Sequence, residues 1–310
     1  MTSTCTPSVL VDTDLSAVAL VVVNYGSHKH LVNNLTRVVV GRDCGRVVVV
    51  DNRTTDDERR AVSRLADQHG WEVVLQDDNP GFGAGCNRGV ERAKELGCTA
   101  FVLLNPDARV SAQTLRALAT DAARNPLSLT TPRLVRPDGT DWFTGGQIDL
   151  RTGRTRTLNE FHGKTEPWLT AACLMVHRTL WDLVGGFDER FFLYWEDLDF
   201  SHRCRLAGAQ LRVREDLVAV HDVGGTQGVG KSSVYYLQNC RNRLLFGAKH
   251  AHREDLWRWV WHTPGYAAAV VLRGGRRQLL RFWSPIIAAG RGSWQGLLLV
   301  ASSRRRRRSR

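Results

Sequence analysis

The first part of the chain alternates short apolar runs with amphipathic stretches, and this alternation limits the fold more than any other feature of the sequence. Four runs rich in β-branched residues read as buried strands: residues 18–23, 47–50, 73–75 and 101–104. Helical patterning separates or follows them, near residues 31–40, 58–69, 84–96 and 115–124. Strands that alternate with helices form a mostly parallel sheet, because the chain must cross the sheet before each new strand. The sequence therefore predicts a doubly wound α/β fold.

Downstream of these elements a change of pattern predicts a smaller antiparallel part. Clusters of Gly, Pro and Asp there mark turns between short strands. Three longer elements are also predicted: a strand over residues 169–177, a helix from about 197 to 208, and a helix over residues 233–250. We therefore expect one large α/β domain over residues 17–250, preceded by a flexible N-terminus of residues 1–16.

Positive charge is concentrated at the C-terminal end. The 310 residues carry a formal net charge of +12, and residues 251–310 hold thirteen arginines against Glu254 and Asp255. The rest of the chain is therefore nearly neutral. Five of the ten tryptophans also lie in these last sixty residues. We expect a helical Trp/Arg-rich appendage over residues 251–303 and a poly-Arg tail over residues 304–310.

Trp favours membrane–water interfaces and Arg favours anionic headgroups, so this end is expected to hold the protein on an anionic membrane surface. Two alternatives stay open: an inert solubilising tail and a nucleic-acid surface, which the sequence favours least. Residues 1–16 lack the basic start of a signal peptide, and no run of about eighteen apolar residues indicates a spanning helix. Seven scattered cysteines without a CxxC pair fit a reducing compartment. The expected location is cytoplasmic, peripheral on the inner face of the cell membrane.

The densest group of chemically active side chains lies between residues 185 and 200. This stretch places five carboxylates among Phe, Tyr and Trp, and acids are rarely buried unless paired, hydrogen-bonded or bound to a metal. Asp199 and Arg203 are spaced to pair on one helix, whereas Glu196 and Asp197 remain at its mouth. Crowded carboxylates raise one another's pKa, so we predict Asp197 as a general base with Glu196 beside it. Capping of the helix N-terminus is the alternative for each acid.

Polar residues that follow the predicted strands form a second candidate group. Asn105 and Asp107 come directly after an apolar strand, where open α/β sheets hold their ligands. Their amide and carboxylate oxygens suit a hard divalent cation that also binds phosphate, and an Asx-type turn is the alternative. Asp51 ends the second strand and can accept from a base or a ribose, or cap a turn. His221 can be a metal or phosphate ligand, or a structural histidine.

A glycine-rich turn occupies residues 79–89. Its backbone amides can face a phosphate at a helix N-terminus, although a plain tight turn fits as well. Cys86 stands where the third glycine of the dinucleotide fingerprint belongs, and the Gly-Lys-Ser/Thr of a P-loop is lacking. Farther along the chain, Arg241 and Arg243 lie within the predicted helix over residues 233–250. They can reach a pyrophosphate or be solvated.

Taken together, these segments resemble a family 2 inverting glycosyltransferase of the GT-A fold, in particular the bacterial rhamnosyltransferase-like subgroup. The resemblance covers residues 17–250, and its order and spacing are more specific than any one motif. The matching segments are 22–25, 50–52, 79–89, 104–107, 185–188, 196–199 with Arg203, His221 and 236–243.

The resemblance implies a nucleotide-diphosphate sugar donor at the carboxyl edge of the sheet. Asp51 would contact the nucleotide base, and Asp107 would hold Mg²⁺ or Mn²⁺ on the diphosphate with help from His221. Asp197 would deprotonate the acceptor hydroxyl, so that the sugar is transferred with inversion. Asn105 replaces the first acid of the common D-x-D pattern, which leaves one formal charge at the metal. Further implied donor-binding residues are Asn24, Asn79, Gly81, Asn87, Asn105 and Arg241.

The subgroup also suggests a dTDP-rhamnose donor and a lipid-linked or cell-envelope glycan acceptor. Two other classes of function remain. A sugar-nucleotide nucleotidyltransferase is expected to carry a basic, Gly-rich first loop, whereas Lys29 is the only Lys or Arg in residues 24–30. A non-catalytic membrane or nucleic-acid adaptor on the same fold is opposed by the acids at each expected catalytic position.

Overall fold

The computed structural model describes residues 15–36, 45–157, 165–222, 231–273 and 283–308. The expected flexible N-terminus falls outside the described residues except for its last two positions. Leu15 is buried and lies in a short 3-10 helix, η1 (Leu15–Ala17).

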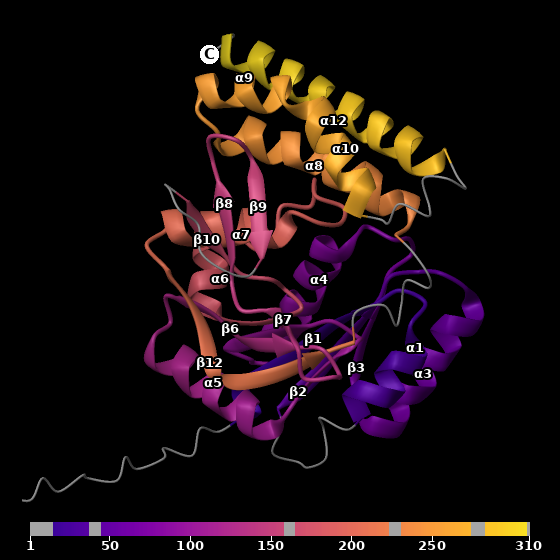
Figure 1. The fold of residues 1–310 in the computed structure, drawn as a ribbon. Coiled ribbons are helices and arrows are strands. Elements are labelled where there is room, and N and C mark those ends of the chain that lie inside the picture. Colours follow the sequence, from indigo (N-terminus) through magenta and orange to yellow (C-terminus); the bar gives the residue numbers. More distant parts are fainter. Residues whose placement is uncertain (1–14, 37–44, 158–164, 223–230, 274–282, 309–310) are drawn as a thin grey trace, which may run out of the picture.

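Strands and helices alternate through the first part of the chain, as the apolar runs predict (Figure 1). Each of the four predicted strands is present, and helices separate them. The elements after η1 are β1 (Val18–Asn24), α1 (His28–His30), η2 (Leu31–Leu35), β2 (Arg46–Asp51), α3 (Asp56–His69), β3 (Glu72–Leu75), α4 (Phe82–Glu95), β4 (Ala100–Leu104), β5 (Ala108–Val110) and α5 (Ala112–Arg124).

The remainder of the chain begins with short strands and ends in helices. This order confirms the predicted change of pattern. The elements are β6 (Ser128–Val135), β7 (Asp141–Phe143), β8 (Gly146–Asp149), β9 (Arg154–Thr157), β10 (Glu166–Trp168), β11 (Cys173–His177), α6 (Arg178–Val184), α7 (Glu196–Leu206), β12 (Gln210–His221), α8 (Ser233–His250), α9 (Arg253–Trp261), α10 (Thr263–Arg273) and α12 (Ser284–Arg308).

The main sheet has the strand order β3-β2-β1-β4-β11-β6-β12-β5, with β7 paired to β6. Strands β3, β2, β1 and β4 are parallel, and β11 runs antiparallel to both β4 and β6. Every residue of β1 is buried, as expected of a strand covered on both faces. Helix α4 packs close to β1 because Gly89 has no side chain: a Cβ there would lie 2.4 Å from Val21 Cγ1. A second sheet, β10-β8-β9, is antiparallel.

Three predicted boundaries are wrong. The helix expected over residues 31–40 is a short α1 followed by the π-helical turn η2, and residues 37–44 lie outside the described part. The strand expected over residues 169–177 begins only at Cys173, since Trp168 belongs to β10 in the small sheet. Helix α7 begins at Glu196 rather than after Asp197.

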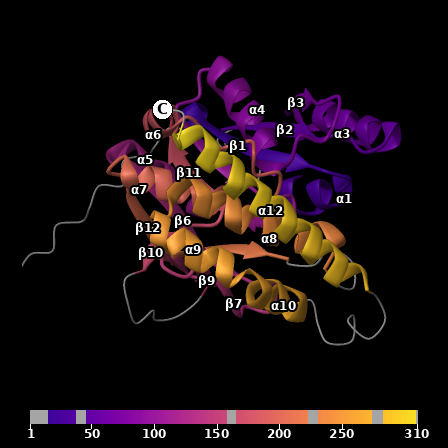
Figure 2. The ribbon, with the colours of Figure 1, turned by 90° about the horizontal axis from the view of Figure 1, so that it is seen from above.

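The C-terminal helices form a layer of their own above the sheets (Figures 1 and 2). Helix α12 packs along α8, and the backbone of α12 continues to Arg308. The predicted division between residues 303 and 304 is therefore not a break in secondary structure. Across the described ranges, none of the helices is both long enough and apolar enough to cross a membrane.

Candidate active site

The polar residues after β1, β2 and β4 meet at one edge of the sheet, because parallel strands end on the same side. Asn24 and Asp51 are register partners at the ends of β1 and β2. Asn105 and Asp107 follow the end of β4, which is β1's other neighbour. The structure therefore places these residues at the carboxyl edge of the sheet, where the resemblance implies a donor site.

Asn24 is the centre of a buried polar cluster. Its amide nitrogen donates to Asp51 Oδ1 (2.9 Å) and Glu58 Oε1 (3.1 Å), and its oxygen accepts from the Ser27 backbone N–H and hydroxyl. Glu58 also accepts from the His28 backbone N–H at 2.7 Å. Both amide hydrogens of Asn24 are thus used within the protein. The arrangement makes Asn24 a residue that positions Asp51. Because both of its amide hydrogens bond within the protein, neither is free for the predicted contact with the sugar-nucleotide donor.

Asp107 and His221 form a buried pair at the same edge. His221 Nε2 lies 3.0 Å from Asp107 Oδ1 and 3.3 Å from the side-chain nitrogen of Asn105. The His221 ring packs edge-on against Trp142, with ring centroids 4.2 Å apart. Strand β12 brings His221 here by pairing with β5, which directly follows Asp107. The structure therefore joins two residues that are 114 positions apart and that the sequence predicts to share a metal.

These residues fit a divalent cation that also takes ligands from its substrate. The pair offers one carboxylate and one imidazole, and Asn105 adds an amide beside them. Within the described ranges no group of three or more His, Cys, Asp or Glu residues is placed to hold a metal on its own. Mg²⁺ and Mn²⁺ often bind through one or two side chains plus phosphate oxygens. A cation here would therefore depend on the diphosphate of a bound substrate.

Glu196 and Asp197 are the first two residues of α7, and their environments raise the pKa values of both carboxyl groups. Glu196 is buried, and its Oε2 atom has no hydrogen-bond partner among the described residues. Burial raises the pKa of Glu196 well above its ordinary value, and the charge of Asp197 adds to this shift. Asp197 is partly exposed, and burial raises its pKa to about 6, although hydrogen bonds from Leu198 and Ala171 oppose the rise. An Asp197 carboxyl with a pKa of about 6 is mostly ionised at neutral pH, as a general base requires.

Asp197 and the Asn105–Asp107 group both lie beside the segment 170–172. Thr170 and the Ala171 backbone are close enough to Asp197 to lower its pKa, and the Asp197 carboxylate accepts from the Leu198 backbone N–H at 2.8 Å. Ala172, the residue after Ala171, accepts from the Asn105 backbone N–H at 3.0 Å. The segment 170–172 therefore lies beside both Asp197 and Asn105.

The glycine-rich turn is used to hold the site together. The Gly81 N–H donates to Asn79 Oδ1, and the Phe82 N–H donates to the Phe192 carbonyl at 2.9 Å. A Cβ on Gly81 would lie 2.2 Å from that same carbonyl oxygen, so only glycine permits this approach. The interpretation of these two amides as free phosphate ligands is wrong. The alternative of a tight turn describes them.

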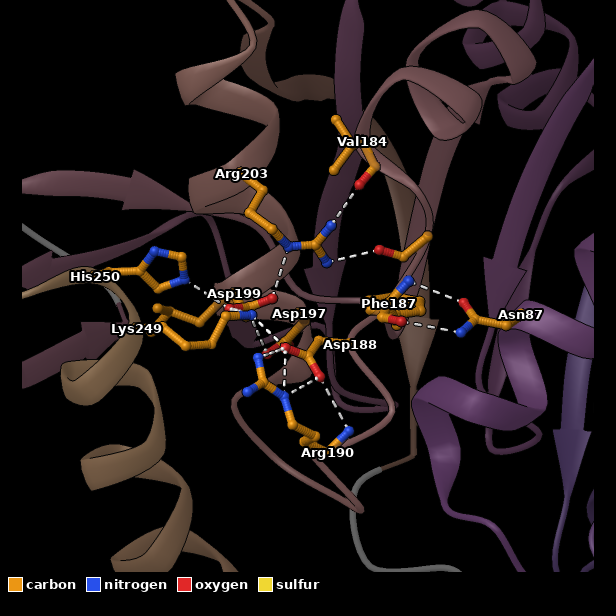
Figure 3. Close-up of polar contacts among 12 residues, drawn as sticks. Asn87, Val184, Phe187, Asp188, Arg190, Asp197, Asp199, Arg203, Lys249 and His250 are labelled. Atoms are coloured by element: carbon orange, nitrogen blue, oxygen red, sulfur yellow. Dashed lines mark hydrogen bonds and ion pairs between the residues drawn. The ribbon is translucent and has the colours of Figure 1, made fainter. Parts of the chain in front are cut away.

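Asn87, on α4, also holds this part of the fold (Figure 3). Its amide oxygen accepts from the Phe187 N–H at 2.9 Å, and its nitrogen donates to the Phe187 carbonyl at 3.0 Å. This two-way bond fastens the segment before Asp197 to α4. Asn87 therefore supports the site. Its side-chain nitrogen also donates to Glu189, so neither of its amide hydrogens is free for the predicted contact with the sugar-nucleotide donor.

The two residues before Glu196 have a strained backbone. Tyr194 and Trp195 have φ values of 67° and 75°, a region that non-glycine residues rarely enter. The buried Asn242 of α8 holds this turn: its side-chain nitrogen donates to the carbonyls of Leu193 (3.0 Å) and Tyr194 (2.8 Å). Asn242 thereby fixes the direction in which the chain enters α7. It is a positioning residue that sequence reasoning did not single out.

Replacing Asn242 with Ala is expected to lower kcat by about 10- to 100-fold, because a shift of about 1 Å in Asp197 is costly. The KM for the donor is also expected to rise, since the Asn242 side-chain oxygen accepts from Arg241 Nη1 at 2.6 Å. The apparent pKa of the kcat profile is expected to move as well. Asn239→Ala is the matched control, since among the described residues the Asn239 amide bonds only to the Tyr235 carbonyl of its own helix. Equal kcat values for the two variants would show that Asn242 has no role in positioning.

Asp199 is at the centre of an ionic network (Figure 3). Its fully buried carboxylate contacts Arg203 Nε (2.8 Å), Lys249 Nζ (2.6 Å) and His250 Nε2 (2.7 Å). The predicted Asp199–Arg203 pair is confirmed. Lys249 also pairs with Asp188, so the network joins α7, α8 and the loop before the base.

The two arginines of α8 have different roles. Arg243 is buried, donates to the carbonyls of Thr152 and Trp259, and stacks over Tyr266 with its Cζ 4.6 Å from the ring centroid. It therefore neither reaches a pyrophosphate nor is solvated, and both predicted alternatives for it are wrong. Arg241 is partly exposed, donates to the Arg190 carbonyl at 3.0 Å, and has no acidic partner among the described residues. It remains available to an anion.

Glu58 shows why some site residues escape sequence reasoning. Thr55 and Glu58 have the spacing of a helix capping box, and the Thr55 side chain does accept from the Glu58 N–H. The Glu58 carboxylate instead reaches Asn24 and His28 on the neighbouring loop. The local signal correctly predicts where α3 begins and gives no information on the partner.

The sheet order, the small antiparallel sheet and the acids at the strand ends define the GT-A fold of glycosyltransferases. The mannosyltransferase PcManGT from Pyrobaculum calidifontis, solved with GDP-Man and Mn²⁺, is similar in structure. Its TM-score is 0.52 at 16% identity, over 92% of this chain and 86% of that one. At this identity the likeness concerns the fold alone.

The chain belongs to glycosyltransferase family 2, whose model, described as "Glycosyl transferase family 2", matches residues 20–205. A low-salt glycan biosynthesis hexosyltransferase of Haloferax volcanii, Agl10, is 25% identical over 75% of this chain and 76% of its own length. An N-acetylglucosaminyl-diphospho-decaprenol L-rhamnosyltransferase of Mycobacterium tuberculosis is 28% identical over 61% of this chain and 70% of its own. The protein is thus a glycosyltransferase with hexosyltransferase and rhamnosyltransferase relatives.

Proposed function

We propose that this glycosyltransferase transfers a hexose, with L-rhamnose from dTDP-rhamnose as the first candidate, onto a lipid-linked glycan with inversion at the anomeric carbon. One arrangement supports the proposal. Asp197, whose pKa is about 6, lies beside the segment 170–172, and that same segment bonds to Asn105, which stands next to the Asp107–His221 pair. One group accepts a proton from the acceptor hydroxyl. The other lies where a donor diphosphate would be held at the sheet edge.

In this proposal each residue has a separate task. Asp51, at the end of β2, contacts the nucleotide, and Arg241 contacts the diphosphate, since its guanidinium is partly exposed and unpaired among the described acids. Asp197 takes the hydroxyl proton as the acceptor oxygen attacks the anomeric carbon and the bond to the diphosphate breaks. Asp107 and His221 would hold Mg²⁺ or Mn²⁺, which when bound offsets the charge on the leaving diphosphate.

The acceptor is proposed from the relatives and from the basic C-terminal end. The M. tuberculosis relative is named for a diphospho-decaprenol acceptor. A lipid-linked acceptor requires the enzyme to work at a membrane surface, and the excess of arginine over residues 251–310 fits an anionic one. We therefore propose a cytoplasmic protein that is peripheral on the inner membrane face.

The experiment that tests the donor site measures binding and nucleoside diphosphate release with the full chain. The panel contains dTDP-rhamnose, UDP-GlcNAc and GDP-mannose, each with Mg²⁺, with Mn²⁺ and with a chelator. Selective binding of one donor, strengthened by metal, would support the proposal and identify the sugar nucleotide. If no member of the panel binds under any condition, the proposed donor site is wrong for these donors.

Replacing Asp107 with Asn is expected to weaken the metal-dependent part of donor binding by at least about tenfold, because it removes the one charged ligand of the pair. The metal-independent part is expected to change less. Asp216→Asn is the control, since Asp216 is an exposed acid on the same strand as His221. Titration of Mn²⁺ at fixed donor concentration gives the comparison. Identical Mn²⁺ curves for the two variants would exclude Asp107 as a ligand.

A further inference from the structure

Helix α12 has one face built for close contact with α8. Its buried residues are small or apolar and recur at helical spacing: Pro285, Ala288, Ala289, Gly292, Gly296 and Val300. A Cβ on Gly292 would lie 2.1 Å from the Leu237 carbonyl oxygen, so the two helices touch at the backbone. This face attaches α12 to α8, and Ala288 and Ala289 also pack with Val270 and Val271 of α10.

The opposite face of α12 is also apolar, and it is exposed. Trp283, which directly precedes α12, and Ile287, Trp294 and Leu298 on the helix are 78%, 58%, 64% and 51% exposed. Their spacing of four, seven and four residues places them in one stripe along the helix. Ile286, 45% exposed, lies beside this stripe. Figures 1 and 2 both show α12 on the outside of α8, away from the sheets. An apolar stripe of this size on an outer surface marks an interaction site.

We infer that this stripe, which we call the outer face of α12, binds an anionic lipid membrane by lying in its interface. The helix that carries the stripe ends in Arg304–Arg308, five consecutive arginines. Exposed Trp, aliphatic side chains and a basic end are the composition of helices that lie in the membrane interface. Trp261, which ends α9 and is 82% exposed, adds a third exposed tryptophan on the layer of C-terminal helices.

Charge distinguishes a lipid surface from a second copy of the chain. Residues 251–310 carry thirteen arginines against two acids. Two such surfaces repel each other, whereas anionic headgroups attract each of them. The occupant to which the charge pattern points is therefore an anionic lipid surface.

Helix α8 lies between this membrane contact and the proposed active site. This step of the inference rests on the proposed lipid-linked acceptor. One side of α8 bonds through Asn242 to the strained turn before Glu196 and Asp197. Another side, at Leu237 and Leu244, receives Gly292 and Gly296 of α12. Packed helices lie about 8–10 Å apart, so the membrane contact is one helix layer from the loop that carries the base. An acceptor whose lipid stays in the membrane can then present its sugar to the site.

The test uses the full chain with vesicles of phosphatidylcholine alone or of equimolar phosphatidylcholine and phosphatidylglycerol, without donor or acceptor. Wild type is expected to sediment with the anionic vesicles only. The double variant Ile287→Gln, Trp294→Gln is expected to lose at least about tenfold in vesicle affinity, because two large apolar side chains no longer enter the interface. The matched control is Leu183→Gln, Leu206→Gln, which changes exposed leucines on α6 and α7. It is expected to bind as wild type does.

Three results would overturn the inference: wild type that does not bind the anionic vesicles, a double variant that binds like wild type, or a control that loses binding equally. Light scattering is measured in parallel. A dimer that only the double variant breaks, without vesicle binding, would assign the outer face of α12 to a second copy instead. The proposed transferase activity is tested separately, by measuring nucleoside diphosphate release without vesicles. The double variant is expected to leave that release unchanged.

Discussion

Replacing Asp197 with Asn is expected to lower turnover by about 10²- to 10⁴-fold while donor affinity stays within a few-fold of wild type. The amide preserves the shape of the side chain but accepts no proton from the acceptor hydroxyl. Wild-type kcat is expected to rise with pH and level off above about 6, because burial raises the pKa of Asp197 to about 6. Glu189→Gln, an exposed acid of the same segment, is the control and should keep its activity. Full activity in Asp197→Asn would show that another group is the base.

The stability of the same variant separates a lost base from a damaged fold. A carboxyl with a folded pKa near 6 and an unfolded pKa of about 3.9 destabilises the fold as pH rises between these values. Above about pH 6 the ionised Asp197 therefore costs the native state at most about 3 kcal/mol. Asn is neutral at every pH, so Asp197→Asn is expected to unfold at higher urea concentration than wild type at pH 7. A variant that is inactive and less stable would point to misfolding.

The order of the elements and the Asp199–Arg203 ion pair could be predicted from the sequence because both depend on local patterns. Buried parallel strands such as β1 and β4 are continuous apolar runs, and these are visible without any partner. The position of Asp197 at the start of α7 follows from the helix that its neighbours form. The Asp199–Arg203 pair follows from a four-residue spacing on that helix.

What the sequence could not show depends on contacts between distant segments. Asn242 and Tyr194 are 48 positions apart, and neither pattern nor propensity indicates that an α8 amide holds a left-handed turn before α7. Arg243 reads as a solvated helix residue until Thr152 and Trp259 are seen to supply its acceptors. From the sequence, Gly81 can belong either to a phosphate-binding loop or to a tight turn. The close approach of the Phe192 carbonyl distinguishes the two, and it is a tertiary contact.

Replacing Asp199 with Asn is expected to cost about 3–5 kcal/mol of unfolding free energy at pH 7, the second large effect that the structure implies. The carboxylate is fully buried and contacts Arg203, Lys249 and His250, so the change leaves these groups without their counter-charge. Urea unfolding at pH 7 measures the loss. Asp182→Asn is the matched control, because Asp182 also pairs with two cations but is exposed, and its loss is expected to stay below about 1 kcal/mol.

The pH dependence assigns this cost to the charge rather than to packing. Burial raises the pKa of Asp199, but His250, Arg203 and Lys249 outweigh burial and lower it to about 2. A lowered folded pKa gives stability that is present above the unfolded value of about 3.9 and is lost as pH falls toward 2. Wild type should therefore lose about 2 kcal/mol from this group between pH 4 and pH 2, whereas the Asn variant should not. The difference in stability between the two proteins is expected to narrow by that amount in acid. A gap in stability that stays constant down to pH 2 would mean that the amide disturbs the packing of α7 against α8 instead.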